Sequence, residues 1–323
     1  MNILVLGGGG YVGRVLLEHL RAHGHRLVVV DIFRFSACTE VAEIAEVRAC
    51  DTRDLTVADF ADFDAVVDLA AISNDPAGEL NPSLTREINA LARQRSAKLA
   101  KQAGVERHLL LSSCSVYGAN DAIVDETAPL NPLTAYAWCN ALAEDGVLAL
   151  SGPDFCSTVF RLATVFGSSP SMRFDLVVNT MTLNAFEHGG LTITGGGGQF
   201  RPLVHVEDVA RAVTAALDAP AARVNAEIFN IGSVNLTMRE VAAAVVRGIA
   251  RPIEVVVDTA TIDHRNYRVA TDKARDILKI TPSHSIEDGA AAIFRGLTAG
   301  HLQRSPQSIR LNGYRELVNT LVA

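Results

Sequence analysis

The glycine-rich segment of residues 7–13, Gly-Gly-Gly-Gly-Tyr-Val-Gly, constrains the fold of this chain more than any other segment. It follows an apolar run, residues 2–6, that we expect to be a strand, and it opens a segment with the apolar spacing of a helix. In such a turn Gly7 allows the chain to reverse direction, Gly10 lets the backbone approach a pyrophosphate, and Gly13 lets the helix pack close to the strand. The helix N-terminus adds amide donors and the positive end of its dipole. The segment therefore predicts a binding site for a dinucleotide.

Short apolar runs rich in β-branched residues recur along the chain, and segments with helical periodicity separate them. Runs that are apolar on both faces are typical of buried parallel strands, and their alternation with helices favours a doubly wound parallel sheet. The runs are residues 2–6, 27–30, 65–69, 108–111, 158–162 and 227–231. We therefore predict an α/β Rossmann domain over residues 1–165, to which 204–232 return. The rest, 166–203 and 233–323, is expected to form a smaller α+β substrate domain.

Composition excludes several classes of protein. The chain has 323 residues, 49% of them hydrophobic, but no apolar run approaches the roughly 20 residues that a membrane span needs. The net charge is −7 without a basic cluster, so nucleic acid is not an expected partner. No secretory signal precedes the first strand, which favours the cytoplasm. The five cysteines have no metal-ligand spacing and are expected to be free thiols without a metal.

Asp31 ends the second predicted strand and indicates which dinucleotide is bound. A carboxylate at this place accepts hydrogen bonds from the adenosine ribose and repels a 2′-phosphate, so it favours NAD over NADP. Arg34 stands close by and is able to pair with a phosphate, which leaves NADP as the alternative.

Several further motifs fall in a fixed order. They are Asp68-Leu69-Ala70-Ala71, the segment Ser-Ser-Cys-Ser-Val-Tyr-Gly at 112–118, Tyr136 after Asn-Pro-Leu-Thr at 131–134, Phe-Arg-Pro-Leu-Val-His-Val-Glu-Asp-Val-Ala at 200–210, and Asp-Lys-Ala at 272–274. With the glycine segment they resemble the extended short-chain dehydrogenase/reductases, and more narrowly the NAD-dependent nucleotide-sugar epimerase/dehydratase family. The resemblance covers nearly the whole chain. It implies NAD as cofactor, a nucleotide sugar as substrate, and a homodimer formed through a four-helix bundle of helices 85–104 and 134–150.

The resemblance also implies roles for individual residues. Ser113 matches the residue that hydrogen-bonds the reacting oxygen, and Tyr136 matches the tyrosine that exchanges its proton. The cofactor residues implied are Gly7, Gly10, Tyr11, Val12, Gly13, Asp31, Asp51, Thr52, Leu69, Ala70, Ala71, Ser73, Asn89, Tyr136 and Asn140. The substrate residues implied are Ser113, Thr164, Arg173, Asp175, Arg201 and Arg265, with Arg268 as an alternative to the last.

One position departs from the family pattern. Relatives carry lysine four residues after the tyrosine, where this chain has Asn140, and its four lysines all lie far from this segment in sequence. That lysine holds the nicotinamide ribose and lowers the pKa of the tyrosine, which without help is about 10. Three interpretations stay open: the positive nicotinamide ring supplies the field, another group such as Cys114 is the base, or redox activity is lost. We favour an enzyme that survives with an altered Ser113–Tyr136–Asn140 site.

The residues after Ser113 bear on the reaction. Sugar dehydratases of the family have an Asp-Glu pair there and related decarboxylases have a Glu, whereas this chain has Cys114 and Ser115. Dehydration and decarboxylation are therefore disfavoured, although a carboxylate from elsewhere, such as Asp75, stays possible. Epimerisation or keto reduction of a nucleotide-activated sugar remains. The alternatives are a catalytically silent NAD-binding regulatory or partner protein, and a non-sugar ketoreductase or aldolase-like relative.

Overall fold

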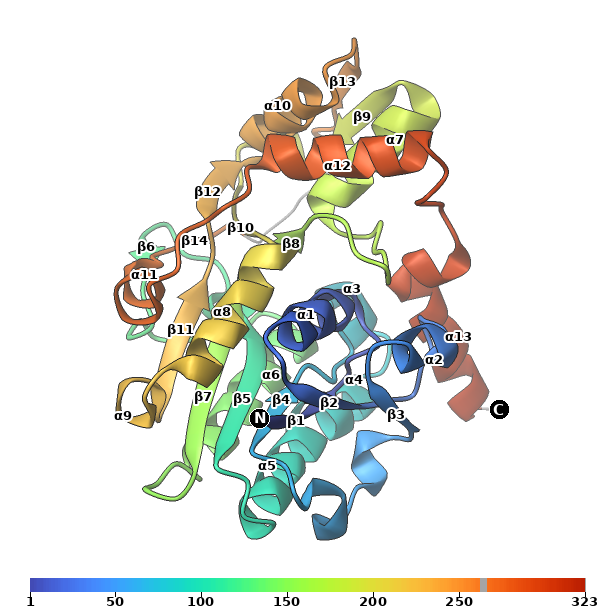
Figure 1. Cartoon of the computed structure of the whole chain (residues 1–323). Helices are drawn as coiled ribbons and strands as arrows, with labels where there is room; N and C mark the ends of the chain where they lie inside the picture. The colour runs from blue at the N-terminus through green and yellow to red at the C-terminus, as the bar shows by residue number, and fades with distance from the viewer. Residues whose placement is uncertain (262–265, 323) are drawn as a thin grey trace.

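A seven-stranded sheet dominates the computed structural model, which describes residues 1–261 and 266–322 (Figure 1). Its order is β11-β7-β5-β4-β1-β2-β3, and all neighbouring strands are parallel. The strands are β1 (Asn2–Leu6), β2 (Arg26–Asp31), β3 (Glu46–Ala49), β4 (Ala65–Asp68), β5 (Arg107–Ser113), β7 (Cys156–Leu162) and β11 (Glu227–Ile231). The predicted α/β class and all six predicted strands are confirmed. The sequence did not reveal β3, because its half-exposed residues form no apolar run.

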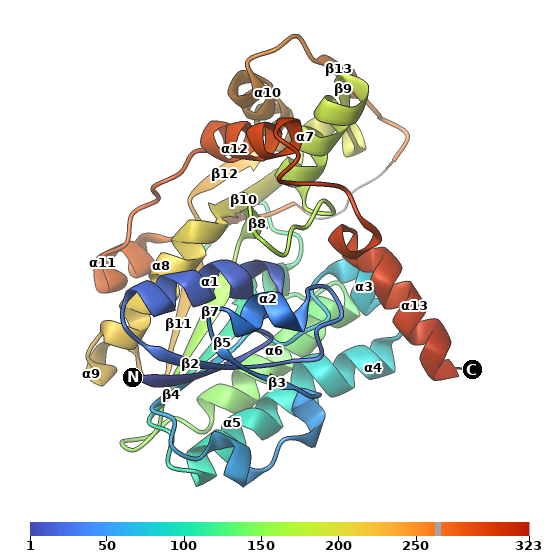
Figure 2. The ribbon, with the colours of Figure 1, turned by 45° about the vertical axis from the view of Figure 1, so that its right-hand side comes forward.

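Helices cover both faces of this sheet, as Figure 2 shows. On one face lie α1 (Tyr11–Ala22) and α8 (Val206–Asp218), which pack on each other and share the largest apolar cluster. On the other face lie α4 (Pro82–Arg86), the π-helical segment η3 (Glu87–Ala92), α5 (Arg93–Gln102) and α6 (Ala135–Leu148). The last four correspond to the two helices predicted over 85–104 and 134–150.

The strand order places the site. The chain passes from β1 outward to β2 and β3, and then returns to the other side of β1 to form β4, β5 and β7. Connections after β1 and β4 therefore leave the sheet in opposite directions, and a crevice opens at the carboxyl ends of these two strands. The glycine segment follows β1 directly, so the local sequence and the topology put it at the mouth of that crevice.

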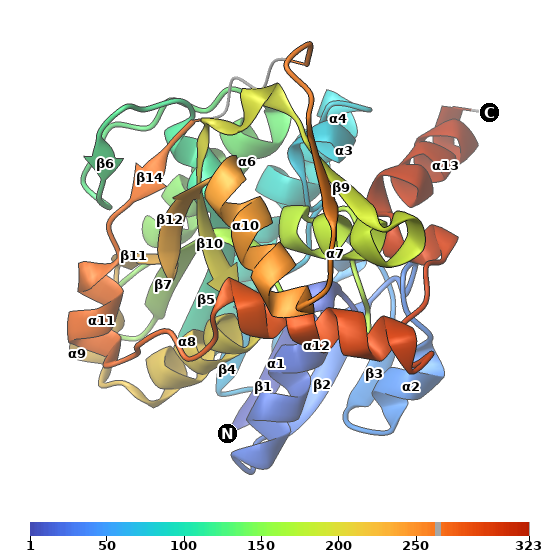
Figure 3. The same cartoon turned by 90° about the horizontal axis from the view of Figure 1, so that it is seen from above.

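A smaller part of the chain lies above the large sheet in Figure 1 and in front in Figure 3. Its strands are β8 (Thr164–Phe166), β9 (Gly190–Ile193), β10 (Phe200–His205), β12 (Val234–Thr237) and β13 (Glu254–Val257). Its helices are α7 (Val177–His188), α10 (Met238–Ile249) and α12 (Ile286–Thr298). These elements share a separate apolar cluster that includes Phe166, Leu203 and Val245. The return of α8 and β11 to the large sheet supports the proposed two-domain division.

Short elements complete the chain. They are α2 (Cys38–Ala42), α3 (Asp75–Gly78), β6 (Ile123–Val124), α9 (Ala221–Val224), β14 (Arg268–Val269), α11 (Asp272–Leu278) and the C-terminal α13 (Arg310–Val322), with 3₁₀ turns at 52–54, 57–60, 114–117, 195–197 and 306–308. The last helix packs on α3, and Tyr314 joins Ile72, Ala77 and Leu84 in an apolar cluster. The C-terminus thus returns to the loop after β4.

Candidate cofactor and substrate site

A cavity of about 580 Å³ opens where the strand order reverses. The turns that follow β1, β2, β4, β5 and β7 line it, together with α6, β8, β10 and α13. The predicted site residues line this one cavity, except for Asn89, for Arg265, and for the alternative candidates Cys114 and Arg268. Arg265 lies outside the described residues.

The glycine turn fits a pyrophosphate. Gly7 has φ +79°, and a Cβ atom on it would lie 2.8 Å from the backbone nitrogen of Ala70, so this turn and the turn after β4 pack backbone against backbone. A Cβ on Gly13 would lie 2.5 Å from the carbonyl oxygen of Gly8. No side chain caps α1 at Gly10, and its first turn holds no acidic residue. The amides and the positive dipole end are therefore left for an anionic ligand.

Asp31 lies beside this turn with an oriented carboxylate. Its Oδ2 accepts from the backbone N–H of Gly9 at 2.9 Å and its Oδ1 from that of Phe33 at 2.8 Å. Burial raises the pKa of Asp31, while the backbone hydrogen bonds from Phe33 and Gly9 oppose that rise. Each oxygen retains acceptor capacity for a ribose hydroxyl. Arg34, the predicted alternative phosphate partner, also lines the cavity.

Asn89 corrects the prediction, because the structure does not bring it to the cavity. The side chain is fully buried; its Oδ1 accepts from the N–H of Ile72 at 2.8 Å and its Nδ2 donates to the carbonyl of Ile72 at 2.9 Å. Both of its polar groups are therefore used in holding the turn after β4. Asn89 shapes the cavity from behind.

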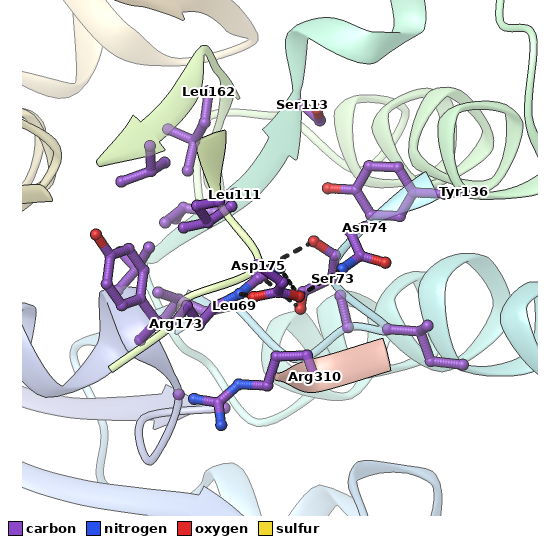
Figure 4. A pocket seen from close by; sticks show the side chains of 18 of the residues that line it. Leu69, Ser73, Asn74, Leu111, Ser113, Tyr136, Leu162, Arg173, Asp175 and Arg310 are labelled. Carbon is purple, nitrogen blue, oxygen red and sulfur yellow. Dashed lines mark hydrogen bonds and ion pairs between the residues drawn. The ribbon is translucent and has the colours of Figure 1, made fainter. Parts of the chain in front are cut away.

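Ser113 and Tyr136, the two predicted reactive residues, both line the cavity. Ser113 ends β5, and Tyr136 lies in the first turn of α6. The Tyr136 hydroxyl points into the cavity (Figure 4). Thr134 caps α6, accepting from the N–H of Ala137 at 3.1 Å, and donates to Asp75 at 2.7 Å. These contacts fix the start of α6 and with it the place of the tyrosine.

The pKa of Tyr136 depends on opposing influences. Burial raises it most, and the carboxylate of Asp75 raises it further. The nearby hydroxyl of Ser113 and the positive charges of Arg93 and Arg173 lower this pKa, although the balance stays above the ordinary value. A base in this position therefore needs additional positive charge, which NAD⁺ supplies when bound.

Asn140 lies one helical turn after Tyr136, lines the cavity and is 1% exposed. Its Nδ2 donates to the carbonyl of Tyr136 at 3.0 Å, and its Oδ1 accepts from Nη1 of Arg93 at 2.9 Å. A buried guanidinium therefore lies directly behind the position where relatives have lysine. The sequence prediction considered only lysines as a source of positive charge at this position, so Arg93 was not predicted.

Cys114 is excluded as the acid or base. It is fully buried, does not line the cavity, and donates to the carbonyl of Arg161 at 3.2 Å. Burial raises the pKa of its thiol far above neutrality, so the group stays protonated and acts as a packing residue.

The substrate side of the cavity is polar. Arg173 binds Asp175 through two hydrogen bonds of 3.0 and 3.1 Å, and its Nη1 donates to Ser73 at 3.1 Å (Figure 4). Asp175 also accepts from Asn74 at 2.9 Å. Most of the guanidinium's donors are thus bound within the protein, and Arg173 ties the segment after β8 to the turn after β4.

Two other predicted substrate arginines differ in position. Arg201, on β10, lines the cavity together with Thr164 on β8 and is 6% exposed. Arg268 lies outside the cavity lining: it donates to the carbonyl of Asp121, and its guanidinium lies 4.7 Å from the ring centre of Phe200. The alternative role for Arg268 is therefore wrong, because both its charge and its planar face are engaged elsewhere.

Comparison with known proteins identifies the family. Residues 3–232 match the NAD dependent epimerase/dehydratase family. The chain belongs to this family. NAD is the cofactor on which the family depends.

Relatives of known or assigned activity cover from 68% to 93% of this chain. An uncharacterized UDP-glucose epimerase of Bacillus subtilis (strain 168) is 26% identical over 323 residues, covering 90% of this chain and 95% of that protein. UDP-glucuronic acid decarboxylase 1 of Danio rerio is 27% identical over 227 residues, covering 68% of this chain and 54% of that one. The structure of MoeE5 in complex with UDP-glucuronic acid and NAD has a TM-score of 0.81 at 27% identity, covering 93% of this chain and all of the other.

The C-terminal helix contributes cavity-lining residues that were not predicted from the sequence. Arg310, Leu311 and Tyr314 of α13 line the cavity. The Tyr314 hydroxyl donates to the carbonyl of Ala71 at 3.1 Å, and Arg310 lies 4.3 Å from the ring centre of Phe35. No motif marks this helix, so no signal in the sequence pointed to its place beside the cofactor turns.

The described part of the chain contains neither a candidate membrane-spanning helix nor a candidate metal site. No helix in residues 1–261 or 266–322 is both long and apolar enough to cross a bilayer. Within the same ranges no three His, Cys, Asp or Glu side chains gather as a metal site would require.

Proposed function

We propose that this protein is an NAD-dependent epimerase of a nucleotide-activated sugar. The observation that carries the proposal is that Ser113 and Tyr136 line one cavity together with the glycine turn and Arg201. One end of the cavity then suits the dinucleotide and the other suits a sugar joined to a second nucleotide.

The chain's own residues supply the proton chemistry. Tyr136 takes the proton from a sugar hydroxyl and later returns it, while Ser113 donates a hydrogen bond to the oxygen that becomes the ketone. NAD, held by the glycine turn and Asp31, would supply a reversible hydride acceptor for the same carbon, and inversion would require the keto sugar to turn so that the hydride returns to its other face. Asn140 keeps one N–H of its amide for a ribose hydroxyl, because the other donates to the carbonyl of Tyr136.

The position of α13 beside the cofactor turns favours epimerisation over net reduction. An epimerase regenerates its cofactor in each cycle, whereas a reductase must exchange NADH for NAD⁺. Tyr314 and Arg310 anchor α13 beside the cofactor turns, which suits a cofactor that stays bound. We retain a keto-reductase as the second candidate, since it would use the same pair in one direction.

The residues after Ser113 and the contacts of Asp75 disfavour dehydration and decarboxylation. The residues after Ser113 are a buried thiol and a hydroxyl, Cys114 and Ser115. Asp75 does line the cavity, but Thr134 donates to it at 2.7 Å and it supports the start of α6. The silent-partner alternative loses its main support, because the Asn140 site retains a buried cation in Arg93.

Calorimetry with free UDP, GDP and dTDP tests the nucleotide-sugar claim. We expect one of the three to bind the NAD-loaded protein with micromolar affinity, and Arg201→Ala to weaken it by about tenfold or more, as the loss of one charge-assisted contact does. Arg268→Ala is the matched control and should bind normally, because that side chain lies outside the cavity. Failure of all three nucleotides to bind would sink the claim.

Product analysis tests the reaction. The sugar nucleotide that shares the preferred base is incubated with enzyme and analysed by proton NMR, while absorbance at 340 nm follows NADH. An epimer without net NADH supports the proposal, and a reduced sugar with consumption of NADH supports the reductase. A product with water or carbon dioxide lost would overturn both.

The free thiols bear on where the protein works. All five cysteines are unpaired, which is usual in a reducing compartment, and we propose the cytoplasm.

A further inference from the structure

The site contains a buried cation behind Asn140. Arg93 is the first residue of α5 and is 1% exposed, and both terminal nitrogens of its guanidinium donate hydrogen bonds. Nη1 donates to Oδ1 of Asn140 at 2.9 Å, and Nη2 donates to the backbone carbonyls of Asp68 at 3.1 Å and Leu111 at 2.5 Å. One side chain therefore joins α5 to α6 and to the carboxyl ends of β4 and β5.

We propose that Arg93 and Asn140 together replace the missing lysine: Arg93 supplies the positive charge behind Tyr136, and the amide of Asn140 presents the hydrogen-bond donor. The proposal rests on the function given above, in which Tyr136 exchanges a proton. Arg93 does not line the cavity, so it acts as a positioning residue through Asn140.

The hydrogen bonds fix the orientation of the Asn140 amide. A guanidinium only donates, so the atom of Asn140 that faces Arg93 must be the oxygen. The nitrogen then faces the carbonyl of Tyr136, which accepts one of its two hydrogens at 3.0 Å. The second hydrogen remains on the cavity side, and the adjacent guanidinium polarises the amide and strengthens this donor. A lysine combines charge and donor in one group, whereas here two residues share them.

The charge of Arg93 is only partly cancelled by its neighbours. Its Nε lies 3.6 Å from Oδ1 of Asp68, but burial raises the pKa of that carboxyl, and Oδ2 has no hydrogen-bond partner within the described chain. His108 is also buried beside it, and burial together with Arg93 lowers its pKa to about 3, so it adds no charge at neutral pH. Glu144, further along α6, is paired with Arg161 at 2.7 Å.

The groups around Tyr136 come from four directions. Asp75 on α3 opposes ionisation, while Ser113 on β5, Arg93 on α5 and Arg173 after β8 favour it. Arg173 is bound to Asp175 by two hydrogen bonds, so its charge is largely balanced. Arg93 thus remains as the cation whose removal should affect Tyr136 most.

The test measures the pKa of Tyr136 directly. Protein labelled with ¹³Cζ-tyrosine is loaded with NAD⁺ and titrated by NMR, and the signal is assigned with Tyr136→Phe. We expect Arg93→Met to raise this pKa by about one unit or more, and Arg93→Lys to leave it within about half a unit of wild type. Arg107→Met, which removes a partly buried arginine that binds only carbonyls of Ala216 and Ala219, is the control and should change nothing.

A second variant moves the charge. In Arg93→Met/Asn140→Lys a cation returns to the turn after Tyr136, and the pKa should fall back to within about half a unit of wild type. The alkaline-shifted kcat profile and the roughly tenfold lower kcat at pH 7 expected of Arg93→Met should recover with it. A purely structural role for Arg93 predicts no such rescue.

Two results would overturn the proposal: an unchanged Tyr136 pKa in folded, NAD-loaded Arg93→Met, or a shift that Asn140→Lys does not reverse. If Arg93→Met does not fold, Arg93→Met/Asp68→Asn removes the stranded carboxylate and the titration is repeated there. If the wild type converts no nucleotide sugar, the proposed function fails, but the NMR titration still decides whether Arg93 acts on Tyr136.

Discussion

At the residue scale, burial controls the titratable groups beside the large sheet, and His108 shows its strength. The imidazole, on β5, is fully buried, and neither ring nitrogen has a hydrogen-bond partner among the described residues. Burial and the charge of Arg93 lower its pKa from 6.5 to about 3. Between about pH 3 and pH 6.5, His108 is therefore neutral in the folded chain and protonated in the unfolded chain.

Acid should therefore destabilise the protein through His108. Because the folded pKa lies below the unfolded one, its contribution is complete above pH 6.5 and is lost as the pH falls toward 3, by at most about 5 kcal/mol. In His108→Leu the free energy of unfolding, measured with urea, should fall less between pH 6.5 and 4 than in the wild type. His301→Leu, at an exposed position, is the control. Parallel curves for wild type and His108→Leu would contradict this assignment.

At the element scale, α13 changes the character of the cofactor site. The helix lies beside α3 in Figure 2, and its Tyr314 and Arg310 contact the turns after β4 and β2. Phe35 and Tyr314 stack edge to face with centroids 5.1 Å apart, which adds an apolar contact between the helix and the turn after β2. The helix therefore covers the part of the cavity where Asp31 would hold the adenosine ribose.

Removal of α13 should loosen the cofactor. A chain ending at Arg304 should bind NAD⁺ about tenfold or more weakly, because three cavity-lining residues are lost. The measurement is calorimetry together with the NAD content after gel filtration, and thermal unfolding checks that the shortened chain folds. Arg315→Ala changes an exposed residue of the same helix and should bind like wild type. Equal affinity in the folded shortened chain would show that α13 does not retain NAD.

At the scale of the whole molecule, one helical face is left with large apolar side chains. Leu91 on η3 is 43% exposed and Trp138 on α6 is 47% exposed, and these two segments pack against each other. Both belong to the helices for which the family resemblance implies a four-helix bundle between subunits. A shared apolar face of this kind suits a two-fold symmetric contact.

We therefore expect a homodimer that this face holds together. Light scattering coupled to gel filtration should give twice the mass of one chain for the wild type and the single-chain mass for Leu91→Glu/Trp138→Glu. Ile123→Glu, which changes an exposed residue on β6, is the matched control and should remain dimeric. A monomeric wild type, or a dimeric double variant, would refute the placement of this interface.

The sequence by itself determined the features that depend on neighbouring residues. The glycine turn and the six strands follow from a short motif and periodicity, because steric limits on glycine and the burial of apolar runs act locally. Ser113 and Tyr136 were predicted from the resemblance to the family. The sequence did not predict β3, because a half-exposed strand has no apolar run. It also did not predict the orientation of Asn89, because a motif does not say which way a side chain points.

Only the tertiary structure decided which distant groups share the site. Arg93 reaches Asn140 across 47 residues, and Tyr314 reaches Ala71 across 243. Such contacts depend on how helices and strands pack, which periodicity does not specify. An arginine four residues after Asn89 on a buried helix face was the one available signal for the cation. The sequence has asparagine at position 140, where relatives have lysine. The charge beside this position nevertheless depends on Arg93, which the fold packs against it.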